Sequence, residues 1–106
     1  MLFVIAALVS VSALDVYVSA DGAYASCVAK QALRLDNGQD RASDIAEAAI
    51  EKCGTAQMKL WQAYYDYLVE QDSDWPRKQT NEYMEARYDR LRTIAIADIL
   101  EKRARR

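Results

Sequence analysis

The sequence contains no histidine, only one proline and only three glycines. Histidine is the commonest general base and metal ligand, so its absence excludes a Ser-His-Asp or Cys-His catalytic site within this chain. The two cysteines cannot form a four-ligand zinc site without further donors, and histidine supplies none. Carboxylate pairs are left as the one route to an enzyme. We therefore expect no metal, no cofactor and no enzymatic activity.

Scarce glycine and proline also bound the fold. An all-β protein needs many tight turns, so few turn formers favour a small number of long helices. Of the 106 residues, 52% are hydrophobic and 28% are charged, which is a globular composition. The length fits one domain. The net charge of −2 gives no general affinity for nucleic acid.

The N-terminal segment is typical of a secretory signal peptide. Residues 2–11, LFVIAALVSV, are uncharged and too short to span a membrane. Small residues allow cleavage after Ala20, which we prefer because Asp21 opens a polar stretch, or after Ala13. A retained membrane anchor and a buried core helix are the alternatives. We expect a signal peptide over residues 1–20, a single helical domain over residues 21–106, and a periplasmic or secreted protein.

The two cysteines fall on two apolar stripes with helical spacing. The first stripe runs from Tyr24 to Leu35 and includes Cys27, and Asn37-Gly38 then favours a helix end. The second stripe runs from residue 42 to Cys53, with Asp40 or Ser43 as its expected N-cap.

An antiparallel hairpin of these two helices would bring Cys27 and Cys53 together. Position 40, midway between them, lies in the expected turn, so both cysteines stand at a similar distance from it. We predict a Cys27–Cys53 disulfide, which requires an oxidising compartment. Two free core thiols and a redox pair are the alternatives.

Residues 55–72 predict a third helix, with Thr55 as a possible cap and a stripe that includes Trp61, Tyr64 and Leu68. We expect this stripe to fill the core of a small bundle. Tyr67 falls off the stripe and is the expected exposed aromatic residue. A binding platform for a sugar polymer or a peptide is the alternative for the cluster.

The last helix is predicted to begin at Pro76, because proline suits the first turn of a helix. It carries an apolar seam of Met84, Tyr88, Leu91, Ala95 and Ile99. Its end is basic, which suits the negative end of the helix dipole and would also suit an anionic surface. These bases are Lys102, Arg103, Arg105 and Arg106.

Together these patterns predict an all-α protein, a small bundle made of a disulfide-clamped helical hairpin and two further helices. The favoured function is a non-enzymatic interaction or assembly factor with a protein partner in the cell envelope, since the seam and the aromatic residues offer apolar surface. The alternative is peripheral binding to a membrane or an anionic polymer through the basic end. The possible interaction surface comprises Tyr67, Lys102, Arg103, Arg105 and Arg106.

Overall fold

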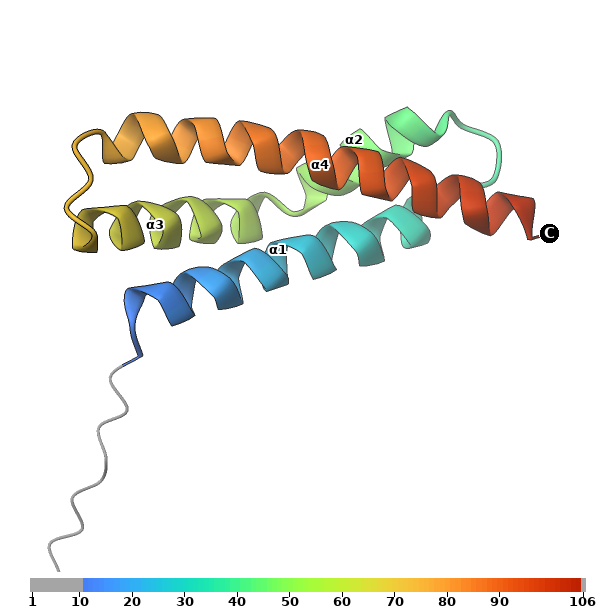
Figure 1. The fold of residues 1–106 in the computed structure, drawn as a ribbon. Helices are drawn as coiled ribbons and strands as arrows, with labels where there is room; N and C mark the ends of the chain where they lie inside the picture. Colours follow the sequence, from blue (N-terminus) through green and yellow to red (C-terminus); the bar gives the residue numbers. More distant parts are fainter. Residues whose placement is uncertain (1–10, 106) are drawn as a thin grey trace, which may run out of the picture.

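The computed structural model describes residues 11–105, which form four helices and no strand. The helices are α1 (Ala13–Leu35), α2 (Ala42–Lys52), α3 (Gly54–Glu70) and α4 (Pro76–Ala104) (Figure 1). The predicted all-α bundle is therefore confirmed.

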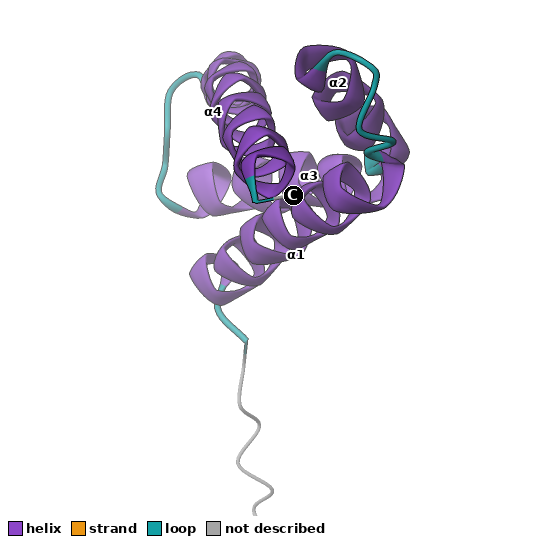
Figure 2. Cartoon of the chain, turned by 90° about the vertical axis from the view of Figure 1, so that its right-hand side faces the viewer, coloured by secondary structure: helices purple, strands orange, loops and turns teal. Residues whose placement is uncertain are grey.

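The two long helices, α1 and α4, pack against each other and against a third rod that is broken in the middle. Helices α2 and α3 form this rod, and the break lies at Cys53, between Lys52 and Gly54. In Figure 1, α3 lies below the first half of α4, and α2 lies beside its second half. Figure 2 looks down the bundle and shows α1 beneath α4 and α2. Helix α1 contacts each of the other three helices.

Three helix starts differ from the sequence prediction, and one agrees with it. Pro76 occupies the first turn of α4 as predicted. Helix α1, however, begins at Ala13 and not near Tyr24, because the Ser12 hydroxyl caps it by accepting a hydrogen bond from the backbone N–H of Asp15. The residue that caps α2 is Arg41, which makes no side-chain cap bond, so the prediction of Asp40 or Ser43 was wrong.

The third helix needs a similar correction at its start. Its N-cap is Cys53 and not Thr55, and no side-chain cap bond forms there.

The turn between α1 and α2 is stabilised by its own hydrogen bonds: the backbone N–H of Gly38 donates to the Asp36 carboxylate at 2.9 Å. Gly38 has a φ of 74°, a left-handed conformation that glycine adopts without strain.

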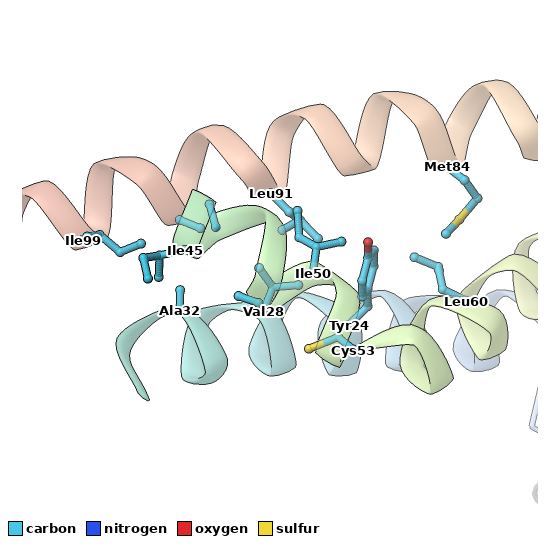
Figure 3. Close-up of a cluster of buried hydrophobic side chains, with 13 residues drawn as sticks. Tyr24, Val28, Ala32, Ile45, Ile50, Cys53, Leu60, Met84, Leu91 and Ile99 are labelled. Carbon is cyan, nitrogen blue, oxygen red and sulfur yellow. The ribbon is translucent and has the colours of Figure 1, made fainter. Parts of the chain in front are cut away.

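One continuous hydrophobic core links all four helices (Figure 3). Tyr24 and Val28 of α1 are almost fully buried at its centre, and Leu60 of α3 joins them. The predicted α4 seam faces this core, with Met84, Leu91, Ala95 and Ile99 buried and Tyr88 packed at the edge. The seam therefore stabilises the monomer, and the expectation that it offers free surface to a partner was wrong.

The predicted disulfide is present. Cys27 and Cys53 are bonded at 2.05 Å, with their Cα atoms 6.0 Å apart. The bond joins the middle of α1 to the break between α2 and α3, so it holds α1 next to both of these helices.

The predicted signal peptide falls on two parts of the chain. Residues 1–10 lie outside the described residues, and residues 13–20 form the first two turns of α1. The preferred cleavage position after Ala20 therefore lies inside α1, whereas the position after Ala13 lies at its start. Cleavage itself stays a prediction.

Candidate functional site

An apolar groove of about 760 Å³ runs between α1 and α3, and Lys52, the last residue of α2, borders it. Small and apolar side chains from both helices make its floor, and the Cys27–Cys53 disulfide lies at one end. A groove of this size and character is the usual form of a binding site for a ligand or a helix. The floor and walls include Val16, Ala20, Ala23, Ala56 and Ala63.

Charged side chains rim the groove in an ordered way. Lys52 and Lys59 lie toward the disulfide end, and Asp15 and Asp66 lie toward the start of α1. All four residues are exposed. The groove is therefore apolar along its floor, basic toward one end and acidic toward the other.

The outer surface of α1 beside this groove also carries large exposed apolar side chains. Leu14 and Val18 are 47% and 58% exposed, and Gly22 continues the same row at a spacing of four residues. Apart from the neighbouring turns of α1 itself, no described residue lies within 4 Å of the position that a Cβ atom of Gly22 would occupy. We name this row, Leu14, Val18 and Gly22, the α1 ridge. A groove and a ridge thus lie side by side on one helix.

A cluster of tyrosines holds this half of α1 against the rest of the bundle. The Tyr17 ring contacts the rings of Tyr64, Tyr67 and Tyr83 at centroid distances of 5.0, 5.6 and 5.6 Å. Tyr67 is half-buried and stacks on Tyr17, so the prediction that Tyr67 is the exposed aromatic residue was wrong. Its off-stripe position points it toward the start of α1, which the sequence pattern assigned to the signal peptide.

A hydrogen-bonded chain extends from this cluster. The Tyr17 hydroxyl donates to Tyr83 at 3.0 Å, and the Tyr83 hydroxyl donates to Asp21 at 2.9 Å. Arg87 donates from Nε and Nη2 to the two oxygens of Asp21, at 2.6 and 3.1 Å. Burial, followed by the bonds to Tyr17 and Asp21, raises the pKa of the Tyr83 hydroxyl far above its ordinary value. The chain links α1 to α4 through three hydrogen-bonded side chains beyond Tyr17 itself: Tyr83, Asp21 and Arg87.

The remaining aromatic residues of α3, Trp61 and Tyr65, contact each other. Trp61 stacks on Tyr65 at 5.2 Å and donates from its indole nitrogen to Asn81 at 2.8 Å. Both rings are partly buried, and Trp61 packs at the edge of the core, as expected. Trp75, in the turn before α4, is the more exposed tryptophan at 70%.

The predicted basic surface is largely engaged within the protein. Arg103 donates to the Asp36 carboxylate at 2.7 and 3.1 Å and to the carbonyl of Asp40 at 2.6 Å. Lys102 donates to the carbonyl of Leu33 at 3.3 Å.

The carboxylate at the centre of this contact, that of Asp36, is inaccessible to solvent. The Arg103 hydrogen bond lowers its pKa, with help from the N–H of Gly38 and against the effect of burial. Arg105 is exposed and lies 3.7 Å from Glu101, and Arg106 lies outside the described residues. Lys102 and Arg103 therefore fasten the end of α4 to the turn between α1 and α2.

The sequence pattern alone missed the groove because residues 1–20 were interpreted as one targeting segment. Two signals point to a helix there. Ser12 precedes Asp15 at the spacing of an N-cap with an acidic first turn. Tyr17 lies seven residues before Tyr24, which in turn lies four residues before Val28. This helical spacing continues the buried stripe of α1 toward the N-terminus.

Within residues 11–105, no three acidic or cysteine side chains are grouped closely enough to hold a metal ion. No helix in this part of the chain combines the length and the apolar character needed to cross a membrane. The groove offers shape, apolar contact and rim charge, which are the means of binding. Comparisons with protein-family models, with curated proteins and with solved structures each found no match for this chain.

Proposed function

We propose that this protein is a non-enzymatic interaction module that docks an apolar helical surface of a protein partner in the α1/α3 groove. The single observation that supports this function is the groove itself, apolar on its floor and charged at its rim. Helix-in-groove recognition uses an apolar helix face for affinity and flanking charges for register. Because the rim is basic toward one end and acidic toward the other, it favours a partner helix that carries opposite charges at its two ends.

The proposed location is the cell envelope or the exterior. A disulfide between the bundle's two cysteines supports an oxidising compartment. For the signal peptide, the contacts of Tyr17 support cleavage after Ala13. Cleavage there removes the Ser12 cap, worth about 1 kcal/mol. Cleavage after Ala20 would remove Tyr17 and its three aromatic contacts, each worth about 0.5–1.5 kcal/mol, together with its hydrogen bond.

Site-specific photo-crosslinking in cells tests the docking function. A photoreactive amino acid replaces Ser19, which is exposed in the groove, or Thr93, which is exposed on α4. We expect an adduct of defined mass from position 19 and none from position 93. Equal labelling from both positions, or none from position 19 at the native expression level, would contradict the proposal. The N-terminus of the same purified protein is expected at Leu14, and a sequence starting at Asp21 would contradict the cleavage proposal.

A further inference from the structure

Helix α1 carries two apolar features that the rest of residues 11–105 leaves without a partner. The groove opens on one side of it, and the α1 ridge lies next to the groove. Monomeric proteins seldom leave contiguous apolar surface of this kind uncovered. Because both features lie on the same helix, a second copy that inserts its ridge into the groove offers its own groove to the first ridge.

Gly22 is an independent sign that another helix approaches here. A glycine inside a helix costs about 0.5–1 kcal/mol relative to alanine. Among the residues that the structure describes, no close contact requires it, since the space beside its Cα is open. A second helix packed against the ridge would use that space, because small residues let two helix backbones come close.

The rim charges fix how two copies would be oriented. Helices α1 and α3 are antiparallel, since Cys27 is bonded to Cys53 while Tyr17 contacts Tyr64. Ser19 therefore lies at about the level of Gln62, and both line the middle of the groove.

The charges fall on opposite sides of this level. At about 1.5 Å per residue, Lys59 lies about 4.5 Å to one side of Gln62, and Asp66 lies about 6 Å to the other. Asp15 lies about 6 Å from Ser19, on the same side as Asp66. A two-fold axis perpendicular to α1, at the level of Ser19, thus brings the acidic end of each groove over the Lys59 of the other copy.

We propose that the occupant of the α1/α3 groove is a second copy of this chain, in a two-fold dimer with antiparallel α1 helices and with Asp15 of each copy opposite Lys59 of the other. The inference rests on the groove being a docking site, as proposed above, and names its partner. It satisfies the requirement of a closed symmetric interface, which is one surface complementary to itself. A dissolved amphiphile with a single charged head would pair with the charges at one end of the groove and leave those at the other end unpaired.

Sedimentation equilibrium of the purified, disulfide-bonded chain tests the dimer. We expect a concentration-dependent monomer–dimer equilibrium. Asp15→Lys alone and Lys59→Glu alone should each weaken the dimer by about tenfold, because each puts like charges together at both symmetric contacts. An equimolar mixture of the two variants should recover the wild-type affinity as a mixed dimer. In that dimer the introduced lysine of one copy meets the introduced glutamate of the other, and the unchanged Asp15 and Lys59 meet at the second contact.

A matched control keeps the charge change but moves it away from the groove. Lys78→Glu makes the same change at an exposed position on α4 and should leave the equilibrium unchanged. A loss of association equal to that of Lys59→Glu would show that only the net charge matters.

Gly22→Leu separates association from folding. Leucine favours the helix more than glycine does, so the helical content and the unfolding midpoint of the monomer should not fall. The dimer should nevertheless weaken by roughly a hundredfold, because the side chain blocks close approach.

A wild-type chain that stays monomeric at millimolar concentration overturns the dimer, as does a dimer that is insensitive to both Gly22→Leu and the charge changes. The crosslinked mass from position 19 separates this failure from that of the docking function. Twice the mass of the chain supports the dimer, and a mass that includes a different protein overturns the dimer but upholds docking.

Discussion

Helices α1 and α4 both bury an apolar face in the same core, but their outer surfaces differ. Helix α4 exposes mainly charged residues, and its exposed Ile94 and Leu100 stand six positions apart. The start of α1 exposes Leu14, Val16 and Val18 within five positions. Isolated apolar residues are ordinary on a surface, whereas a contiguous patch indicates contact with something else. The comparison shows that the exposed apolar residues of α4 are scattered and those of α1 are clustered, which supports the proposal that α1 is the helix that contacts a partner.

The largest expected effect comes from the disulfide, which anchors α1 covalently while α4 is held by noncovalent contacts alone. Replacing both cysteines by alanine frees a loop with a sequence separation of 26 residues. The free energy of unfolding should fall by about 3.5 kcal/mol. Urea unfolding measures this, and hydrogen exchange should show faster opening of α1 than of α4. Equal acceleration in both helices would remove the distinction between them.

Leu91→Ala should cost about 3 kcal/mol, because it opens a cavity beneath the buried side of α4. The matched change Val18→Ala shortens an exposed side chain on the α1 ridge and should alter monomer stability by less than about 0.5 kcal/mol. Urea unfolding at low protein concentration measures both variants. A large loss for Val18→Ala would mean that the ridge is already packed within one copy.

Asp21→Asn should destabilise the protein by about 1–2 kcal/mol, since it weakens hydrogen bonds from Arg87 that join α1 to α4. The effect is moderate because both side chains keep some contact with water, with exposed fractions of 28% and 18%. Hydrogen exchange should locate the loss in residues 14–21, where α1 is attached through Tyr17 and Asp21. An unchanged unfolding midpoint would show that the aromatic contacts alone hold this segment.

The smallest effect at neutral pH concerns the tyrosine hydroxyls. Burial raises the pKa of Tyr24, Tyr64 and Tyr83 above the ordinary value of 10.0. Above pH 10 the unfolded chain loses these protons before the folded chain does, so their contribution to stability is constant below that pH and falls as pH rises beyond it. Tyrosinate absorbance should show these rings ionising together with unfolding. Smooth ionisation in the folded protein would contradict the raised values.

Sequence reasoning recovered the features that are local or covalent. The buried seam of Met84, Leu91 and Ile99 follows from the helical period of the sequence. The start of α4 follows from Pro76, because proline is favoured in the first turn of a helix. The pairing of Cys27 with Cys53 followed because the two cysteines lie on apolar helix faces at equal distances along the chain from one turn. Each inference needed only spacing along the chain, which the fold does not change.

Tertiary structure decided which apolar surface is used and which is free. The α4 seam was expected to offer apolar surface to a partner, but it is buried in the core. The start of α1 was interpreted as part of a targeting segment, but its residues line the groove. Likewise Lys102 and Arg103 bind Asp36, some 67 residues earlier in the chain, which no local pattern indicates. The physical reason is that period and composition identify which faces of a helix are apolar, while only packing determines which of those faces the other helices cover.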